Sequence, residues 1–179
     1  MCFRKSALAI LRSSQAIRTC YNRVMTLIEK LAFTCGMVLF MEGFAWATHK
    51  YVMHTWGWGW HRSHHEPNSG PVEKNDLYAL CFATVVVIMF AAGLWLEWLW
   101  WVALGITIYG GIYFFVHDML VHERFGLRWV PRRGYFKRLQ QAHRIHHAVK
   151  SREGAVSFGF LIAPDPRRLK LELRKRASV

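Results

Sequence analysis

Long apolar stretches separated by polar turns dominate the middle of the chain. Three of them, residues 31–48, 77–94 and 102–116, carry almost no charge and approach the length of about 17–25 residues that a helix needs to cross a bilayer. A shorter apolar stretch, residues 155–163, is expected to lie at the membrane interface or to re-enter the membrane beside the functional site. The pattern predicts an all-α integral membrane helical bundle with three or four spans.

The polar positions next to these stretches are largely histidines, and they follow the same order twice. Each half of the chain has two histidines five positions apart and then a His-x-x-His-His box. Neutral imidazole is the commonest protein ligand of transition metals, and four imidazoles saturate a tetrahedral ion, so a larger set indicates two metals in one pocket. The four boxes hold all ten histidines of the chain: His49, His54, His61, His64, His65, His117, His122, His143, His146 and His147.

The spacing of the boxes carries structural information. In each His-x-x-His-His box the first and third histidines are four positions apart, which places them on one face of a helix, with the middle histidine close by. His49 and His54 are five apart, about 140° around an ideal α-helix, and so are His117 and His122. Either the members of these pairs serve different metals, or the helix loosens at each pair.

Composition supports a membrane protein with a basic surface. Of the 179 residues 53% are hydrophobic and 15% aromatic, and the formal net charge is +13. The sequence has no helix-turn-helix or zinc-finger spacing and no aromatic-and-basic single-strand motif, so we expect no nucleic-acid partner. The four cysteines form no Cys-x-x-Cys pair, which predicts neither a disulfide framework nor a thiolate metal site.

The distribution of charge predicts the topology. Of the 24 basic residues, 15 follow His117, whereas the Trp-rich turn 95–101 has none, so the histidine boxes are expected on the cytoplasmic or stromal side. Residues 1–24 are basic, Ser-containing and free of acidic residues. We expect them to be an N-terminal extension, either a transit peptide or sequence upstream of a true start at Met25, followed by one domain, residues 25–179.

Few carboxyl groups lie near the histidines. Glu42 stands inside the first apolar stretch, about 10 Å from His49 along a helix, so it is expected to support a ligand or helix packing rather than bind the same ion. The alternative for Glu42 is a protonated, hydrogen-bonded carboxyl. Glu66, Asp118 and Glu123 each follow a histidine and are expected to orient ligand N–H groups. A His-Glu-x-x-His motif, typical of zinc hydrolases, does not occur.

These motifs resemble those of the bacterial β-carotene hydroxylases of the membrane fatty acid hydroxylase superfamily. The doubled His-x4-His and His-x2-His-His boxes are typical of the superfamily, and the resemblance covers about residues 27–170. The surrounding segments point to the carotenoid branch: Gly57–His61, Asn75–Tyr78, Pro131–Tyr135 and Val156–Phe160. The N-terminal segment departs from the short bacterial pattern and leaves either a bacterial inner membrane or a plastid membrane as the location.

The resemblance implies a non-haem di-iron monooxygenase that hydroxylates C3 of each β-ionone ring. β-Carotene from the bilayer would become β-cryptoxanthin and then zeaxanthin, and canthaxanthin could lead to astaxanthin. The implied cofactors are two iron ions, with O2 as co-substrate and electrons from ferredoxin and its NAD(P)H-dependent reductase. All ten histidines are then candidate iron ligands, and Glu42 and Asp118 are candidates to support them.

Two other functions remain open from the residues. The first is a hydroxylase or desaturase that acts on another lipid, such as an acyl chain or a sterol. The second is a membrane metal carrier without catalysis, which would place the histidines along a channel through the bilayer. Because the boxes fall at the ends of the apolar stretches, and the basic residues around them suit lipid headgroups or an acidic electron donor, we favour the oxygenase.

Overall fold

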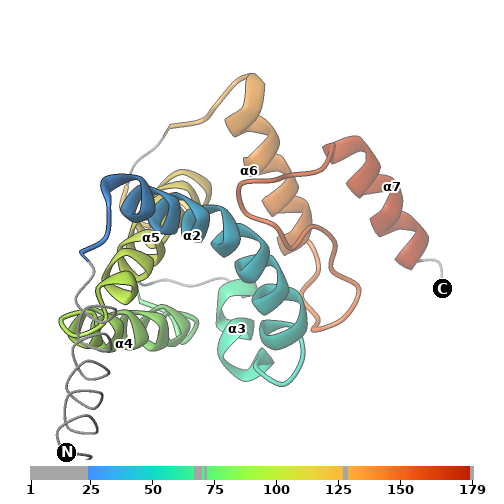
Figure 1. Ribbon diagram of the computed structural model, residues 1–179. Helices are drawn as coiled ribbons and strands as arrows, with labels where there is room; N and C mark the ends of the chain where they lie inside the picture. Colours follow the sequence, from blue (N-terminus) through green and yellow to red (C-terminus); the bar gives the residue numbers. More distant parts are fainter. Residues whose placement is uncertain (1–23, 67–69, 71, 127–128, 178–179) are drawn as a thin grey trace, which may run out of the picture.

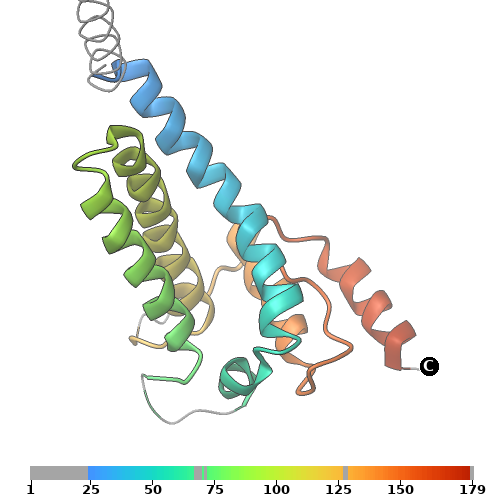
Figure 2. The same cartoon turned by 60° about the horizontal axis from the view of Figure 1, so that its bottom comes forward.

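The computed structural model describes residues 24–66, 70, 72–126 and 129–177, and this part of the chain is entirely helical and irregular, with no strand. Figure 1 shows its helices in order, and Figure 2 shows three of them, α2, α4 and α5, running side by side as an elongated bundle. The expected extension, residues 1–24, lies outside the described residues except for its last one. The all-helical prediction is confirmed over the described part.

Helix α5 is the centre of the bundle. It spans Glu97–Tyr113 and packs against both α2, Leu27–Thr48, and α4, Asp76–Ala92. The contact with α2 is close because α5 carries Gly105 there: a Cβ at this position would lie 2.6 Å from the carbonyl oxygen of Thr34. By contrast, α4 has no buried residue, so it is held mainly along one side. This leaves room between α4 and α2.

Two helical segments are long and apolar enough to cross a membrane. They are Leu27–Met53 and Glu97–Val121, and each continues from an α-helix into a π-helix. The third expected span corresponds to α4, which has 17 residues and is shorter than the other two because a turn follows at Gly93. Two candidate spans are therefore found, and the third remains a prediction from the sequence.

The two π-helices occur where histidines are five positions apart. They are η1, His49–Met53, and η2, Phe114–Val121. The backbone N–H of His54 donates to the carbonyl of His49 at 3.1 Å, and the N–H of His122 donates to that of His117 at 2.9 Å. This i→i+5 bond is the defining feature of a π-helix and brings residues five apart onto one face. The loosened helix is thus the correct alternative of the two that the spacing left open.

A smaller helical layer lies at the end of the bundle where both π-helices occur. It comprises α3, Trp58–His65, α6, Gly134–His147, and α7, Pro166–Ala177. The irregular segment 149–164 connects α6 to α7 and contributes buried Val156 and Ala163 to a core that also contains Leu139, Ile145 and Leu169.

The Arg- and Lys-rich residues 167–176, whose charge alone would predict a solvated basic tail, instead form most of a packed helix. They lie in α7, whose Leu169 is 7% exposed and packs in the core against α6. Arg176 also donates to the carbonyl of Ala155 at 2.7 Å. Leu169 and Leu173, which are four positions apart, give this basic stretch one apolar face. The number of charges in the stretch does not reveal this face.

Candidate metal centre

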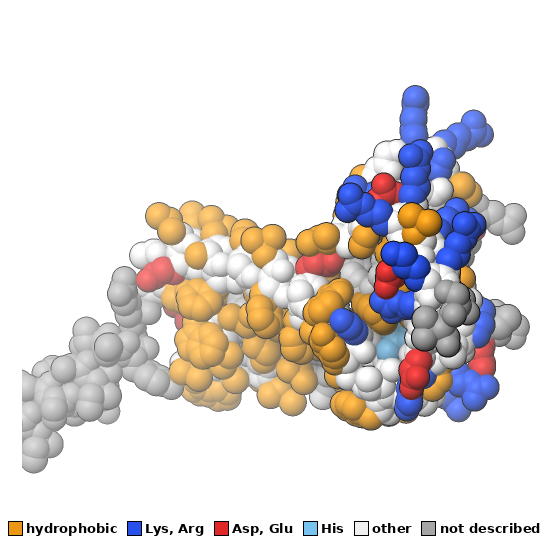
Figure 3. All heavy atoms as spheres, turned by 90° about the vertical axis from the view of Figure 1, so that its right-hand side faces the viewer, with side chains coloured by type: hydrophobic (Ala, Val, Ile, Leu, Met, Phe, Trp, Pro, Cys, Tyr) orange, Lys and Arg blue, Asp and Glu red, His pale blue; other side chains and the backbone are white. Residues whose placement is uncertain are grey.

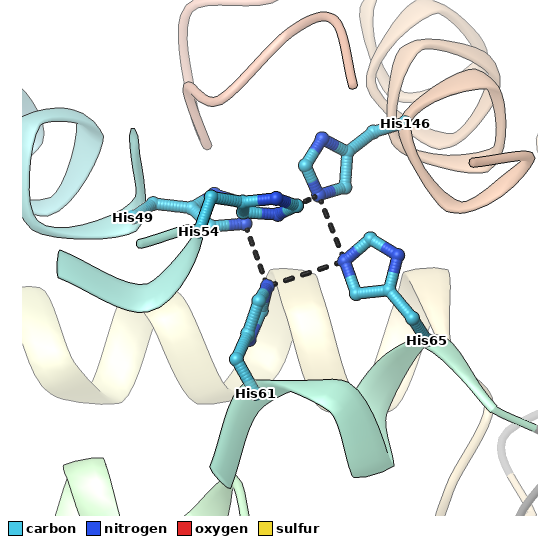
Figure 4. A group of neighbouring side chains, drawn as sticks. All are labelled: His49, His54, His61, His65 and His146. Carbon is cyan, nitrogen blue, oxygen red and sulfur yellow. Dashed lines mark hydrogen bonds between the residues drawn. The ribbon is translucent and has the colours of Figure 1, made fainter. Parts of the chain in front are cut away.

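Five histidines converge in what we call the first cluster. It draws on both halves of the sequence: η1 and its C-terminal cap, α3 and α6 each contribute. Their potential ligand atoms all lie within 4.8 Å of one another, and all five side chains are buried. Figure 4 shows the rings pointing toward a common centre. The members are His49, His54, His61, His65 and His146.

A second cluster lies beside the first and contains His64, His117, His122 and His143. His147 joins it by ring contacts, with centroids 4.5 Å from His143 and 4.7 Å from His64. The Nε2 atom of His147 is one of the few buried side-chain nitrogens of the described residues that have no hydrogen-bond partner. Together the two groups bring together all ten histidines that the sequence singles out.

The His-x-x-His-His boxes divide between the clusters. In α3, His61 and His65 point into the first cluster, whereas His64 between them belongs to the second. In α6, His146 belongs to the first cluster and His143 to the second. One short helix in each half therefore supplies ligand candidates to both groups, which keeps the two groups adjacent.

Hydrogen bonds fix the orientation of every ring in the first cluster. Each Nδ1 faces an oxygen acceptor at 2.8–3.0 Å, and neutral imidazole carries only one N–H, so the proton resides on Nδ1 and Nε2 keeps a bare lone pair. This arrangement is the usual support of metal-binding histidines. The acceptors are the carbonyls of Phe158, Arg152, Val149 and Val156 and the side-chain oxygen of Asn75.

The bare Nε2 atoms face one another, which fits a cation and little else. In the first cluster the Nε2 pairs His49–His61, His54–His146 and His61–His65 are 3.1–3.2 Å apart. Two lone pairs at this distance repel, whereas neighbouring ligands about 2.1 Å from one ion stand about 3.0 Å apart in five- or six-coordinate geometry and about 3.4 Å in a tetrahedron. The residues therefore fit a transition metal.

Burial keeps these imidazoles uncharged. Desolvation, reinforced by His49, lowers the pKa of His61 to about 2, and desolvation lowers the pKa of His65 to about 4. In the second cluster, desolvation and the neighbouring imidazoles hold the pKa of His64 and that of His143 well below the usual value. At neutral pH each ring is thus ready to bind a metal without first losing a proton.

Carboxylates orient two rings of the second cluster. The Nδ1 of His64 donates to Glu73 at 2.8 Å, and the Nδ1 of His117 donates to Asp118 at 3.0 Å. Arg124 donates to Asp118 at 3.1 Å and to Asp76 at 2.7 Å, which ties η2 to the start of α4. The negative charges of these carboxylates favour a cation bound by the two histidines.

Glu42 reaches the first cluster through the backbone. Its Oε1 accepts the N–H groups of three consecutive residues, 160–162, at 2.8–3.0 Å, and its Oε2 accepts the hydroxyl of Tyr109 at 2.8 Å. The same segment presents the carbonyl of Phe158 to His49 and that of Val156 to His146. Glu42 therefore joins α2, α5 and the segment that orients two of the five rings.

An apolar cavity of about 410 Å³ separates α4 from α2 and leads to both clusters. Four histidines line it at the α3 end, two from each cluster: His49 and His61, and His64 and His117. Apart from these rings and a few hydroxyls, the wall is hydrocarbon. A stripe along α4 extends about 16 Å at 1.5 Å per residue and consists of Ala79, Phe82, Ala83, Val86, Val87 and Phe90. The shape suits a long apolar ligand with one end at the metals.

Comparison with known proteins agrees with this geometry. The family model described as fatty acid hydroxylase matches residues 34–164, which include all ten histidines. The chain belongs to the fatty acid hydroxylase family. No solved structure matches it.

Among curated members of the family, several bacterial relatives are similar to this chain over most of its length. The beta-carotene hydroxylase of Paracoccus sp. (strain PC1) is 54% identical over 140 residues, which cover 77% of this chain and 86% of the relative. That of Pseudescherichia vulneris is also 54% identical, covering 78% and 80%. The chloroplastic beta-carotene 3-hydroxylase of the alga Haematococcus lacustris is 39% identical over 141 residues, 75% of this chain and 43% of the relative.

Sequence reasoning missed two residues that contact the histidines and placed two others wrongly. Glu73 and Asn75 bond to His64 and His61. Asn75 begins one of the segments that carry the resemblance, but that segment assigns it no role, and no motif marks Glu73. The two misplaced carboxyls do not orient a histidine: Glu66 pairs with Arg62 at 2.6 Å on the surface, and Glu123 with Arg144 at 3.6 Å. Position next to a histidine is a weak guide, because successive side chains of a helix point in different directions.

Proposed function

We propose that this protein is a membrane-bound non-haem di-iron monooxygenase that hydroxylates C3 and C3′ of the β-ionone rings of carotenoids. β-Carotene is converted through β-cryptoxanthin to zeaxanthin, and canthaxanthin to astaxanthin by the same reaction. The observation that supports this most directly is the apolar cavity that ends on histidines of both clusters. The names of the bacterial and chloroplastic relatives support the substrate and the ring position.

In this proposal the two clusters hold one iron each. The first iron would be held by His49, His54, His61, His65 and His146, and the second by His64, His117, His122, His143 and His147. The chemistry that the irons would supply is activation of O2, in which one oxygen atom enters a ring C–H bond and the other leaves as water, with the uptake of two electrons and two protons.

The residues of the chain supply orientation and exclusion of water. The carbonyls of segment 149–158 hold four rings of the first cluster and Asn75 holds the fifth, while Glu73 and Asp118 hold two rings of the second. Glu42 fixes that segment from inside α2. The wall of α4 keeps an apolar ring beside the histidines and away from water, which protects the reactive site during turnover.

The proposal extends to the electron supply and location. Electrons come from ferredoxin and its NAD(P)H-dependent reductase, and the high positive charge of the chain suits an acidic donor. The chain resides in the bacterial inner membrane, with the histidine clusters on the cytoplasmic side, because 15 of its 24 basic residues follow His117. A plastid membrane is the alternative if residues 1–24 are a transit peptide.

The decisive experiment is expression in a host that makes β-carotene, followed by pigment analysis and by iron analysis of the purified chain. We expect zeaxanthin, β-cryptoxanthin as the intermediate, and two irons per chain.

An acyl chain would also fit the apolar cavity, and the family description favours it as the second candidate. A hydroxylated fatty acid without zeaxanthin would replace the carotenoid assignment, while bound metal without oxygen-dependent product would indicate a metal carrier.

A further inference from the structure

A second hollow borders the first cluster and shares no lining residue with the apolar cavity. Its volume is about 590 Å³, and it lies between the end of α2, segment 152–164 and α7. His54 lines it, so it reaches the first cluster directly. Figure 3 shows histidine atoms in a recess between the hydrophobic bundle and the end of the molecule that is rich in Lys and Arg. The proposed hydroxylation does not use this hollow.

The lining of the hollow is amphiphilic. Its cations are Lys50, Arg152 and Arg176, and its apolar part includes Ile162 and Leu169. The two arginines have exposed ion pairs with Glu153 and Glu172, at 2.9 and 3.0 Å. Exposed pairs of this kind contribute little, so a stronger anion can replace them. Guanidinium groups bind phosphate in bidentate fashion, which makes a phosphate such an anion.

The hollow lies at the level where a membrane headgroup would be. Trp46 and Tyr51 are exposed on its rim, and the amine of Lys50 lies 5.0 and 4.9 Å from their rings. Trp and Tyr concentrate at the membrane interface, and Lys extends its amine toward it. The candidate span that contains α2 ends at Met53, a few residues further on.

Helix α7 forms the outer wall and is itself suited to the interface. It carries Leu169 and Leu173 against α6, whereas its other face is strongly basic. Beside it, Ile162 is 74% exposed at the apolar end of the hollow. A basic amphipathic helix of this kind lies in the headgroup region and favours anionic lipids.

We propose that the hollow binds an anionic phospholipid, with its phosphate at Lys50, Arg152 and Arg176 and an acyl chain along Ile162 and Leu169. The backbone carbonyl of Arg152 orients His54, so a lipid at this place would also steady the segment that supports the first cluster and cover it from water. An acidic protein is less suited, because the anionic group would have to enter a recess with an apolar floor.

The test is lipid retention by the full chain. The protein is reconstituted in nanodiscs of phosphatidylcholine with an equal amount of phosphatidylglycerol, and the lipids that remain bound after extraction in mild detergent are counted by native mass spectrometry. The wild type should retain phosphatidylglycerol selectively. The double variant Lys50→Gln/Arg152→Gln should lose this selectivity roughly 30-fold, the effect expected for two cations at a membrane surface.

The matched control is Arg132→Gln/Arg133→Gln, which removes the same charge before α6 and should retain phosphatidylglycerol like the wild type. Equal retention by both double variants would overturn the proposal, since it would mean that only net charge matters. Displacement of the lipid by soluble glycerol phosphate would show a site for free phosphate and would also contradict it. Because lipid retention does not depend on hydroxylation, this proposal and the proposed function can fail separately.

A second measurement follows the supporting segment. Hydrogen exchange of residues 149–158 should slow when phosphatidylglycerol replaces phosphatidylcholine in the nanodisc, in the wild type but not in Lys50→Gln/Arg152→Gln. If the double variant instead lost only turnover driven by a protein electron donor, with lipid retention and exchange unchanged, the hollow would be a docking site for that donor and the lipid assignment would be wrong.

Discussion

At the scale of single residues, the choice of hydrogen-bond acceptor decides what each histidine can do. Every ring of the first cluster gives its Nδ1 proton to an oxygen, four times a main-chain carbonyl and once Asn75. A carbonyl holds a ring without adding charge, whereas Glu73 and Asp118 add negative charge to the second cluster. A metal bound by the second cluster would therefore be stabilised more strongly in a higher oxidation state than one bound by the first.

The carboxylate of Glu73 provides a sharp test at this scale. Glu73→Gln keeps the shape but removes the charge beside His64, so we expect turnover and metal affinity to fall about 10–100-fold, the usual effect of losing such a partner. The matched control is Glu66→Gln, which changes an exposed carboxylate right after His65. Iron content and product formation in membranes measure both. An equal loss in the two variants would contradict the assignment.

Residues of this kind mark the limit of prediction from one sequence. The ten histidines could be identified because they are few, ordered and confined to four boxes. Asn75 and Glu73 could not, because they approach His61 and His64 only after the chain has passed through a loop whose path no local pattern specifies. The main-chain acceptors of segment 149–158 could not be recognised from residue type, since any residue has a carbonyl.

At the scale of elements, two departures from regular packing build the site. Each π-helix turns a five-residue spacing into one face, so both members of a histidine pair serve the same cluster. Helix α4 packs against α5, and a cavity lies between α4 and α2. The sequence indicated the first departure through the spacing of His49 and His54, but an apolar stretch such as α4 gives no indication of a cavity beside it.

A bulky side chain on the inner face of α4 should block the cavity. Ala83→Phe adds a ring to the wall of the cavity, and we expect it to lower carotenoid turnover more than tenfold while both irons stay bound. Val85→Phe adds a similar volume on the same helix at a position that is 51% exposed, and turnover should be unchanged. Pigment analysis with iron analysis checks the pair. Normal turnover in Ala83→Phe would exclude the cavity as the substrate site.

Helix α7 offers a test of stability. Leu169 is 7% exposed and Leu171 is 57% exposed on the same helix. Leu169→Ala should lower the free energy of unfolding by about 2–5 kcal/mol, whereas Leu171→Ala should change it by less than about 0.5 kcal/mol. Thermal unfolding in detergent gives the comparison. Equal midpoints for the two variants would mean that α7 does not pack on α6.

At the scale of the whole molecule, two halves with the same order of histidines combine into two adjacent histidine clusters at one end of a helical bundle. Neither half forms a group alone, since His146 completes the first and His64 completes the second. Each half thus supplies four histidines of one group and one histidine of the other, so both groups are complete only when the two halves come together. This arrangement also explains why the end of the bundle, and not its middle, is polar.

Because the groups are separate, single ligands should be separable too. His146→Ala should remove the first iron, and His143→Ala the second, so each variant should bind about one iron instead of two and lose more than about 100-fold of its turnover. Arg144→Ala, exposed between them on α6, should retain both irons. Iron analysis of purified protein, with membrane insertion as a control, decides this. Loss of both irons from either variant would show that the groups depend on each other.

The architecture could be predicted only in part. The apolar runs specified helices and their order, because hydrophobic stretches of this length in lipid have few alternatives. They did not specify the basic helix α7, nor that α4 is shorter than the two candidate spans. Helix α7 depends on packing against α6, and the length of α4 depends on the turn at Gly93. Mean hydropathy over a window of residues reports neither.

The apolar cavity meets the histidines at one end only, and this has a consequence for any molecule with two equivalent ends. Such a molecule can present one terminus at a time, so it must withdraw into the lipid, reverse and return before its other terminus reacts. The half-finished compound is then a free species that competes with fresh starting material for entry. We therefore expect this compound to accumulate early in a time course and to decline as the starting material is consumed.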